Sequence, residues 1–481
     1  MPDATRLAAP QLVGAAPPPA KPLSFLRQLR AAGGNSYETL PLIVYEEPIH
    51  QQKSLFGRML MVNDPEGVRR VLVDNVANYP KNALENRFFT AMFGEGLLSS
   101  EAAKWRTHRK VMAPAFDPRS VTAYAAEMSR TTQEFAGRWD ALADDVEVDI
   151  TEEMKALTLR IICRTMFSSD ADELVALAGG ALGFTQSALN FSLLDLLPVI
   201  GPRRMKAKEE AIHADFSAFD AAIYRMIAER EKDLEDAPKD LLTRLIAAKD
   251  PENGAGLDAQ EVRDEVITIF MAGHETTAVT MTFVWYLLSQ RPAQEATLHA
   301  ELEAVLAGRA PTAQDLPRLT YTRMVIEEAM RLYPPAPGLS MRQARAADEI
   351  GAVKVKAGDQ IFISPWILHR HRLLWDDPLE FDPERFSAAR SAGRPRFAYM
   401  PFGGGPRICI GAGLALTEAS LILANLAQRH RPRLVDGQDI KLRSRITLGP
   451  RDGMRMTLQR RVPVGAKSEA TPGVLEPAQE A

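Results

Sequence analysis

Apolar and polar residues recur along most of the chain with the spacing of amphipathic helices. Asp64 followed by Pro65 predicts a helix start, and Asp258 with Glu261 forms the pattern of a capping box. Prolines follow shortly after the ends of several predicted helices, as expected for residues that cannot continue a helix. The expected helices span 64–73, 101–112, 258–290, 321–332 and 414–426, with mostly helical sequence from 121 to 250.

Short apolar stretches bounded by turn residues predict a small β portion. Strands are expected over 40–45 and 59–62, and a terminal hairpin is expected over 446–448 and 454–458. The longest predicted helix, 258–290, would measure about 45–50 Å, enough to cross a whole domain. The pattern therefore predicts a mainly α fold with a minor β portion.

The composition is that of an ordinary globular protein, with 46% hydrophobic and 25% charged residues in 481. Lysine and arginine number 58 against 62 aspartates and glutamates, so the formal net charge is only −4. This near balance gives no indication of nucleic acid or of an acidic polymer as the main partner.

The chain has two cysteines, Cys163 and Cys409, which argues against a disulfide framework and fits a reducing compartment. The chain has no run of about 18 uncharged apolar residues, so no membrane-spanning helix is predicted. The first residues lack the pattern of a signal peptide. We therefore expect a cytoplasmic protein without an integral membrane anchor.

The ends of the chain differ in composition from its centre. Residues 1–35 are expected to hold a lead rich in proline and alanine, disordered to about residue 22, and a first helix. Residues 462–481 are expected to form a polar, disordered tail. A single large domain is predicted over 36–461.

The stretch 401–413, PFGGGPRICIGAG, places one cysteine among five glycines just before a predicted helix. Glycines are unfavourable in regular structure but suit a backbone that turns sharply and lies against a flat ligand. Cys409 would gain from free backbone N–H groups and from the positive end of the helix dipole, which favour a thiolate. A thiolate held on a rigid loop is a good metal ligand.

This stretch has three other interpretations. A phosphate-binding loop fails because no Lys-Ser or Lys-Thr follows the glycines. A dinucleotide fingerprint at Gly411 and Gly413 fails because its last position is Leu416 and no strand precedes it. An inert core cysteine stays open on this stretch alone.

Polar residues interrupt the centre of the longest predicted helix, where residues 272–277 read AGHETT. Gly273 would let a flat ligand approach the backbone. The Thr276 hydroxyl can compete for the Ala272 carbonyl and bend the helix. Glu275 in apolar surroundings suits the handling of protons. A polar patch on a half-exposed helix is the alternative.

The cysteine stretch resembles one protein family, the cytochromes P-450. Phe402, Gly405, Arg407, Cys409 and Gly411 match its signature F-x-x-G-x-R-x-C-x-G position by position. In that family the cysteine thiolate is the proximal ligand of haem iron. The resemblance implies haem b as the cofactor, held between the long central helix and the cysteine loop.

Residues 272–277 are similar to the oxygen-binding motif of the same family, A-G-x-[DE]-T-[TS]. The resemblance implies that O₂ is the co-substrate and that Gly273 lies beside the cofactor. It also implies that Glu275 and Thr276 are catalytic, positioning a water and delivering protons.

Two further resemblances concern the support of the cysteine loop. Glu328 and Arg331 are one helical turn apart and can pair. In the family this pair bonds the arginine of a later P-E-R-F segment, which is Arg385 here. The resemblance implies that the three residues lock the loop in place and take no part in catalysis.

The spacing Trp105-x-x-x-Arg109 resembles the family's C-helix motif, in which both side chains bond a haem propionate. Arg342, in a predicted strand, matches a position that often holds the other propionate. Arg106 and Lys110 share a helix face with Arg109 and would suit an acidic electron donor.

The resemblance implies a haem-dependent monooxygenase that inserts one atom of O₂ into an apolar organic substrate by hydroxylation or epoxidation. No Rossmann or flavodoxin-like segment follows residue 461, so electrons are expected from a separate ferredoxin or flavodoxin with an NAD(P)H-dependent reductase. A haem-thiolate peroxygenase and a haem-binding sensor are the alternatives. The pair Glu275-Thr276 argues against both.

Aromatic residues beside Gly94 and Gly96 suggest a loop over an apolar pocket, although ordinary core packing explains them equally well. The run 184–200 resembles the mobile lid region of the family. Fatty acid, terpene, steroid and aromatic substrates all stay open. The candidate pocket residues are Phe88, Phe89, Phe93, Phe184, Phe270 and Leu339.

Overall fold

A computed structural model describes residues 12–14, 18–21, 34–54, 57–168, 201–250 and 254–461. Helices dominate, which confirms the predicted mainly α fold with a minor β portion. The predicted lid region 184–200 and the tail 462–481 lie outside the described residues.

The described α-helices are α2 (Pro65–Arg69), α3 (Ala83–Phe93), α4 (Ala102–Met112), α5 (Pro118–Asp140), α6 (Ile150–Phe167), α8 (Gly201–Lys232), α9 (Leu241–Ala247), α10 (Ala259–Gln290), α11 (Pro292–Leu306), α12 (Thr320–Leu332), α13 (Pro365–Leu368), α14 (Ala388–Ser391) and α15 (Ala412–Leu426). Short 3-10 helices include η1 (Ser36–Thr39), η2 (Leu42–Tyr45), η4 (Val76–Asn78), η5 (Ala113–Phe116), η7 (Ala313–Arg318), η8 (Pro383–Phe386), η9 (Arg396–Ala398) and η10 (Gly405–Arg407), and a π-helical turn, η3, spans Arg70–Asp74. The helices predicted from capping residues and prolines are all present.

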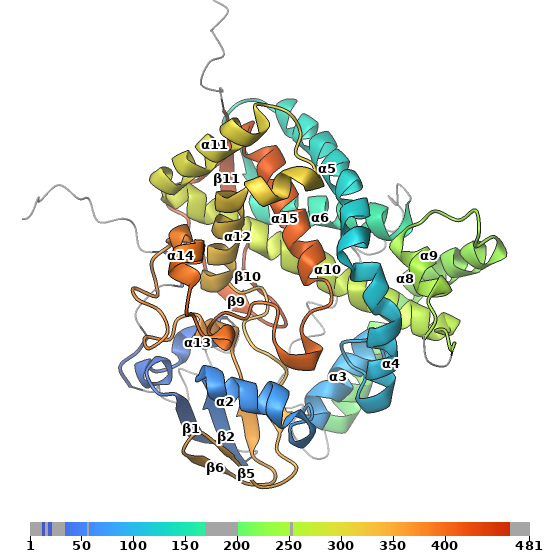
Figure 1. The fold of residues 1–481 in the computed structure, drawn as a ribbon, viewed down its shortest axis with the longest axis vertical. Coiled ribbons are helices and arrows are strands. Elements are labelled where there is room, and N and C mark those ends of the chain that lie inside the picture. The colour runs from blue at the N-terminus through green and yellow to red at the C-terminus, as the bar shows by residue number, and fades with distance from the viewer. Residues whose placement is uncertain are drawn as a thin grey trace, which may run out of the picture.

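Helix α10 runs through the middle of the molecule (Figure 1). The predicted capping box forms: the Asp258 carboxylate accepts from the Glu261 N–H at 2.8 Å, and the Glu261 carboxylate accepts from the Asp258 N–H at 3.2 Å. All residues from 277 to 288 are buried. The helix therefore forms the axis of the core.

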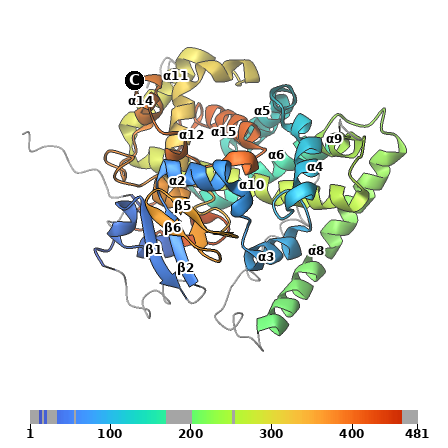
Figure 2. The ribbon, with the colours of Figure 1, turned by 60° about the horizontal axis from the view of Figure 1, so that its bottom comes forward.

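The carboxyl-terminal half of α10 lies in the main hydrophobic core, where α6, α12 and α15 pack on it and α5 packs on α6 and α15 (Figures 1 and 2). The ring of Phe283 stacks on that of Tyr333 with centroids 4.0 Å apart, which joins α10 to the end of α12. The amino-terminal half lies in a second core with α6, α8 and α9. The polar centre of α10 lies between the two cores.

Strands β1, β2, β5 and β6 lie to one side of the helices, beside α2, whereas β11 lies at the opposite end, near α11 (Figure 1). The largest sheet has the order β1-β2-β7-β4, with β2 and β7 parallel and the other pairs antiparallel. The remaining sheets are β3-β11-β8, β9-β10 and β5-β6. The strands are β1 (Ile49–Ser54), β2 (Gly57–Val62), β3 (Val146–Asp149), β4 (Arg342–Gln343), β5 (Asp348–Ile350), β6 (Val353–Val355), β7 (Gln360–Phe362), β8 (His430–Leu434), β9 (Leu442–Ser444), β10 (Leu448–Pro450) and β11 (Arg455–Arg460).

Two strand predictions are wrong. Residues 40–45 hold the 3-10 helix η2, not a strand, and its Val44 and Tyr45 are buried at the edge of the main core. The predicted terminal hairpin does not form, because β10 pairs with β9 while β11 lies between β3 and β8. Strand partners here depend on neighbours distant in the sequence, which local pattern does not reveal.

The described residues 12–14 of the amino-terminal lead contact the helical core. Leu12 is buried in the main core. The Val13 N–H donates to the Tyr286 hydroxyl at 2.9 Å, and the Tyr333 hydroxyl donates to the Val13 carbonyl at 2.6 Å. These contacts fasten the lead to α10 and to the end of α12.

Candidate active site

The loop that carries Cys409 joins η9 to α15 and is shaped by its glycines. Gly403 and Gly405 have φ values of +73° and +70°, which favour glycine. A side chain on Gly405 would clash with the backbone carbonyl of Leu72. The Cys409 N–H donates to the Phe402 carbonyl at 2.9 Å, which closes the loop behind the thiol. The sequence of this loop therefore dictates its turn.

The thiol of Cys409 is exposed, but it faces a space enclosed by protein. Burial raises the pKa of the Cys409 thiol, although the Gly411 N–H and the charge of Arg109 act in the opposite direction. The sequence correctly indicated a favourable N–H group but not that burial would outweigh it. A bound metal cation would supply the missing positive charge, because metal coordination deprotonates a thiol.

Helix α15 follows the cysteine loop directly in the chain and packs against both α5 and α10. It therefore connects the loop to α10. The Thr277 hydroxyl of α10 donates to the Glu418 carboxyl of α15 at 3.4 Å. Burial raises the pKa of Glu418 to about 8, so this carboxyl is largely protonated at neutral pH. The contact is thus a bond between neutral groups.

The turn of α10 around Ala272 has an exposed face. Ala272 is exposed although it lies in the middle of the core helix. The Thr276 hydroxyl donates to the Ala272 carbonyl at 2.7 Å, as its spacing predicted. Phe270 and His274 point the other way, with their rings packed together and Phe219 against Phe270.

Two neighbours of Thr276 have contacts that were not predicted. Glu275 is half-buried and accepts a hydrogen bond from the Thr447 hydroxyl at 2.8 Å. A Cβ on Gly273 would lie 2.7 Å from Cδ1 of Ile162 on α6. Packing between α10 and α6 is therefore a reason for glycine at 273, whereas its predicted contact with a cofactor stays a prediction.

Helix α4 contacts the cysteine loop through Trp105 and Arg109. The guanidinium of Arg407 lies 4.6 Å from the ring centroid of Trp105, a cation–π contact. Arg109 donates to the Ile408 carbonyl at 2.8 Å, beside the cysteine. Arg407 also donates to the Ser100 carbonyl at 2.9 Å. Trp105 and Arg109 thus both support the loop, and a shared carboxylate partner stays a prediction.

Two other basic residues, Lys81 and Arg342, lie near Arg407. The three residues are called here the cation cluster. Burial, followed by the charges of the other two, lowers the pKa of Lys81 to about 7. Burial and Arg407 lower the pKa of Arg342 to about 10, although Glu101 and Glu85 oppose this. The Nε of Arg342 is buried and has no hydrogen-bond partner. The cluster therefore has an excess of positive charge that a ligand with carboxylates would relieve.

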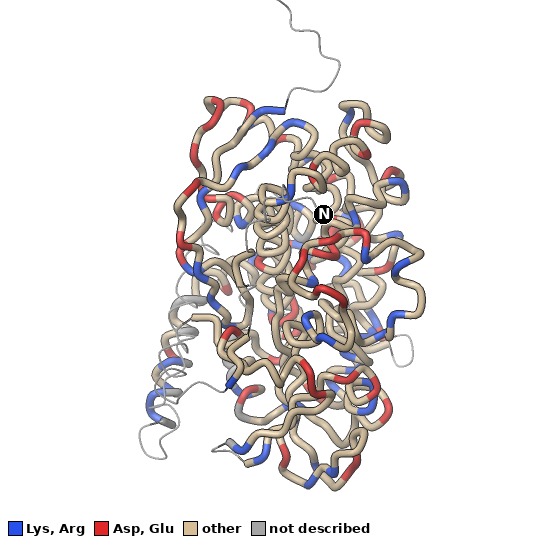
Figure 3. The backbone as a smooth tube through the Cα atoms, turned by 90° about the vertical axis from the view of Figure 1, so that its left-hand side faces the viewer, with Lys and Arg blue, Asp and Glu red and all other residues tan. Residues whose placement is uncertain are grey.

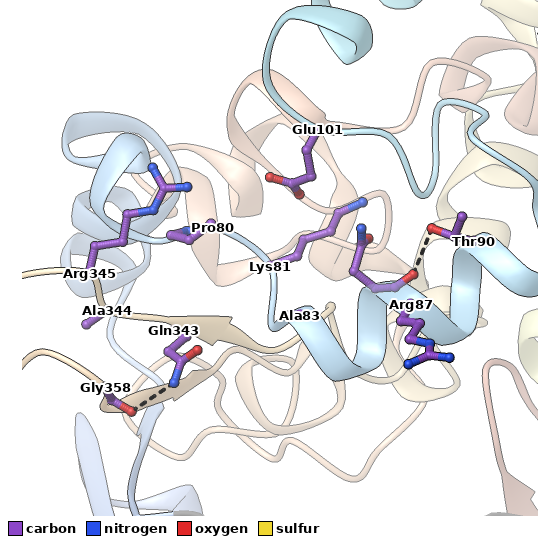
Figure 4. Close-up of a pocket in the computed structure, with 11 residues that line it drawn as sticks. Pro80, Lys81, Ala83, Arg87, Thr90, Glu101, Gln343, Ala344, Arg345 and Gly358 are labelled. Atoms are coloured by element: carbon purple, nitrogen blue, oxygen red, sulfur yellow. Dashed lines mark hydrogen bonds between the residues drawn. The ribbon is translucent and has the colours of Figure 1, made fainter. Parts of the chain in front are cut away.

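Lys81 was not predicted, because a single lysine before a helix carries no motif. It lines a cavity of about 960 Å³ beside the cation cluster. Figure 4 shows Lys81 reaching toward Glu101, with Arg87 and Arg345 at the two ends of the cavity. Its lining includes the charged side chains of Lys81, Arg87, Glu101 and Arg345, so it differs from the apolar pocket expected for a substrate.

A second group of buried charges, called here the lock cluster, contains Glu328, Arg331 and Arg385. Glu328 and Arg331 are fully buried and joined at 2.6 Å, and Arg385 Nε lies 3.4 Å from the same carboxylate. Arg331 also donates to the carbonyl of His369 at 2.8 Å. His369 in turn accepts the N–H of Met400 at 2.9 Å, at the start of the cysteine loop. The cluster is thus connected to the loop.

The chain matches the family model described as cytochrome P450 over residues 26–453. The chain belongs to the cytochrome P450 family. It is 35% identical to cyclooctatin synthase of Streptomyces melanosporofaciens, over 89% of each chain. It is 37% identical to cyclooctat-9-en-7-ol 5-monooxygenase of the same organism, over 79% of this chain and 82% of the relative.

Pentalenene oxygenase of Streptomyces avermitilis is 30% identical, with 83% of this chain and 87% of the relative covered. Among solved structures, the heme domain of cytochrome P450DA superposes with a TM-score of 0.81 at 28% identity, covering 93% and 98% of the two chains. The protein is therefore a cytochrome P450 monooxygenase of bacterial type, an oxidoreductase that uses haem and O₂.

The residues present fit the haem that the cytochrome P450 family implies. Cys409 is exposed on its loop, and the Gly411 N–H favours its thiolate. The turn of α10 at Ala272 is exposed as well. The cation cluster, with its unpaired Arg342 Nε, suits the two carboxylates of a haem. Among the described residues no group of three His, Cys, Asp or Glu side chains offers another metal site.

The segment predicted as a loop over the substrate pocket forms helix α3. Phe88, Phe89 and Phe93 lie on this helix and not in a loop. The rings of Phe89 and Phe93 stack with centroids 6.1 Å apart, and Phe93 is buried in the second core. Gly94 begins the turn only after the helix ends.

Two of the other pocket candidates have different surroundings. Phe270 is fully buried on the side of α10 opposite to Ala272, so the prediction that it lines the pocket is wrong. Leu339 lies beside Gly403 of the cysteine loop. Phe184 lies outside the described residues. In the part of the chain that the structure describes, no helix has the length and apolar character needed to cross a membrane.

Proposed function

We propose that this cytochrome P450 uses haem b and O₂ to hydroxylate or epoxidise an apolar terpenoid, with electrons from a separate donor. One observation carries the proposal. Cys409 and Ala272 both present exposed surface on elements that pack together through α15, and three cations, Lys81, Arg342 and Arg407, gather by the cysteine loop with a buried Arg342 Nε that has no hydrogen-bond partner. Bound haem supplies an iron centre that activates O₂ for insertion into a C–H or C=C bond.

The residues around the proposed haem space have separate roles. Cys409 would hold the iron, and Arg342 and Arg407 would hold the two carboxylates. The Thr276 hydroxyl, kept in place by the Ala272 carbonyl, would orient a water molecule. Glu275 is half-buried on the same turn, so it can exchange protons with solvent and pass them to that water.

The proposed substrate class comes from the named relatives. Two of them are named for reactions on cyclooctat-9-en-7-ol and pentalenene, which are terpenoids. The identities of 37% and 30% extend over most of each chain. Phe89, Phe93 and Leu339 stay candidates for an apolar lining.

The proposed electron donor is a ferredoxin or flavodoxin that docks near the cysteine loop. Ile408 is 38% exposed there, and Arg106 on the adjacent helix α4 is exposed as well. Lys110 lies 3.7 Å from Asp250, so part of the predicted basic face is neutralised by the protein itself. Arg106→Glu should slow reduction by an acidic donor in a salt-dependent way, measured by stopped flow. Equal rates of reduction at low and high salt would contradict the proposal that the donor docks on this face.

Both cysteines are free in the structure, which agrees with a reducing compartment. We therefore propose that the enzyme works in the cytoplasm together with its donor and an NAD(P)H-dependent reductase. Fractionation of cells that express the protein at its natural level would test this location.

The first experiment tests the iron ligand. The purified protein is reduced with dithionite under carbon monoxide, and its difference spectrum is compared with that of Cys409→Ser. A strongly red-shifted Soret band that the variant loses supports thiolate ligation. Cys163→Ser is the matched control, because Cys163 is buried in the second core and should leave the band unchanged. A histidine-type band in the wild type would overturn the proposal.

The second experiment tests the reaction. The enzyme, a surrogate ferredoxin and a reductase are incubated with terpenes, steroids and fatty acids, and products are identified by mass spectrometry. Thr276→Ala should keep NADH consumption but convert most of it to peroxide instead of product. Thr277→Ala is the control, because its hydroxyl faces Gly273 and Glu418 and not the haem space. If only fatty acids or steroids react, the terpenoid assignment is wrong.

A further inference from the structure

Four polar residues of α10, namely Glu261, Glu265, Thr268 and Thr276, lie along the same face of the helix as Ala272. At 100° per residue, their directions fall within about 40° of that of Ala272. Ala272 and Thr276 are the turn that faces the haem space. The same face continues toward the amino terminus of the helix, where it carries a carboxylate at the protein surface.

The outer part of this face is bridged by a histidine of α4. His108 Nε2 lies 3.3 Å from a Glu261 carboxylate oxygen, and His108 Nδ1 lies 2.6 Å from a Glu265 carboxylate oxygen. Glu261 is 27% exposed, whereas His108 is 2% exposed and Glu265 is fully buried. The imidazole thus connects a carboxylate in contact with water to one in the interior.

The charges around His108 favour its protonated form. Burial alone would lower the pKa of His108, but the hydrogen bonds and charges of Glu265 and Glu261 outweigh it and raise that pKa. An imidazole with a raised pKa can carry a proton near neutral pH. The charged groups near the ring are Glu261, Glu265 and the Arg263–Asp264 pair on α10, Lys104 on α4, and Glu95 in the segment before α4.

The inner part of the face contains a hydroxyl with no hydrogen-bond partner. Thr268 is 6% exposed, and its Oγ1 is buried and unpaired. It lies one turn after Glu265 and one turn before Ala272, in close contact with Gly96. An unpaired hydroxyl is rare in a protein interior, and here it occupies the gap between a buried carboxylate and the haem space.

We propose that Glu261, His108, Glu265 and Thr268 form a proton relay from the surface to the haem space. A proton from water enters at the Glu261 carboxylate and passes to His108 Nε2, while His108 releases the proton on Nδ1 to Glu265. Glu265 then protonates the Thr268 hydroxyl, which gives its own proton to a water beside Thr276. One proton enters for each one that leaves, and no electron moves. The relay rests on the proposed monooxygenase reaction, which consumes protons.

The decisive variant is Glu265→Gln, and its matched control is Asp264→Asn. The two acids are adjacent and buried, and each accepts a hydrogen bond from a backbone N–H of the loop before α4. Glu265 accepts from the Leu97 N–H at 3.1 Å, and Asp264 accepts from the Glu95 N–H at 2.8 Å. An amide oxygen can keep both bonds. Asp264, however, is turned by about 100° from the relay face.

Glu265→Gln should lower the kcat of the holoenzyme by roughly tenfold and increase its solvent deuterium isotope effect. KM and the carbon monoxide spectrum should stay unchanged. Asp264→Asn should leave kcat and the isotope effect at wild-type values. Equal kcat in wild type, Glu265→Gln and Asp264→Asn, with product formed in all three, overturns the relay alone. A wild type that binds haem but forms no product overturns the proposed function and the relay together.

A second pair of variants tests the relay if Glu265→Gln does not fold. Thr268→Val removes a hydroxyl that has no partner in the protein, so the fold should not suffer. It should lower kcat in the same way, and Thr268→Ser should restore it. A kcat of Thr268→Val equal to that of wild type excludes Thr268 and with it the proposed path.

A readout independent of turnover is the NMR titration of His108 in the holoenzyme. Its midpoint should lie above the ordinary histidine value and fall in Glu265→Gln, because the carboxylate that favours the charged imidazole is lost. The kcat of the wild type should fall as pH rises through that midpoint. A pH profile with no inflection at the measured midpoint overturns the relay.

Discussion

The lock cluster and the cation cluster are both buried groups of basic side chains near the cysteine loop, yet their partners differ. In the lock cluster, Arg331 uses its Nε and both terminal nitrogens in bonds to the Glu328 carboxylate and to backbone carbonyls. Arg385 has a lowered pKa and an Nε without a hydrogen bond, but this Nε lies 3.4 Å from the same carboxylate. In the cation cluster, Arg342 Nε also has no hydrogen-bond partner, each member has a lowered pKa, and Arg407 lies 3.5 Å from the half-buried Glu101. The lock cluster is thus built around a fully buried carboxylate of the protein, whereas the cation cluster would gain from an anionic ligand.

The difference separates the structural from the ligand-binding use of buried charge. A buried ion pair with all donors satisfied fixes a conformation, and its loss leaves uncompensated charge. A buried group of like charges lowers the stability of the protein unless an anion joins it. A search for ligand sites should therefore look for the incompletely paired cluster.

The largest effect is expected from the lock cluster. Glu328→Gln removes the carboxylate shared by Arg331 and Arg385, so the free energy of unfolding should fall by about 3–5 kcal/mol. Urea denaturation measures this change. Glu327→Gln is the control, because Glu327 pairs with Arg323 on the surface and should change stability by less than about 1 kcal/mol. Similar losses in both variants would contradict the distinction between the clusters.

An intermediate effect is expected from the cation cluster, and only when haem is bound. Arg342→Gln should lower haem affinity by roughly tenfold or more, since a charge-assisted hydrogen bond contributes about 1.5–3 kcal/mol. The stability of the haem-free protein should not fall, because an unpaired buried cation is removed. Transfer of haem to a scavenger protein measures the first quantity, and thermal unfolding without haem measures the second. A destabilised haem-free variant would place Arg342 with the structural charges.

The smallest effect is a pH dependence. The pKa of Lys81 is about 7 in the folded protein and 10.5 in an unperturbed chain, so the unfolded state binds more protons between these values. Stability of the haem-free protein should therefore rise with pH above about 7, and Lys81→Met should lack this component. Denaturation at several pH values compares the two proteins. Bound haem should reduce the difference, because its carboxylates favour the charged lysine.

The sequence predicted the parts of the site that depend on local backbone. The glycines of the cysteine loop, the capping box at Asp258 and the bond from Thr276 to Ala272 all follow from neighbours within a few residues. The paired helix charges at Glu328 and Arg331 follow from spacing in the same way.

The sequence could not predict contacts between distant segments. Lys81 joins the cation cluster from a position without a motif, and Phe270 points away from the haem space although it neighbours the central motif. The partners of β11 also come from elsewhere in the chain. Each of these depends on packing that local periodicity does not encode.

The bonds of Val13 have a consequence for how the chain folds. Its partners Tyr286 and Tyr333 lie 273 and 320 positions later in the chain. On the ribosome the lead emerges first, but it has nowhere to dock until most of the polypeptide has been synthesised. Contacts of such sequence separation form slowly, so docking of the lead should be among the last events of folding. A protein stalled before residue 333 would keep this segment accessible to proteases.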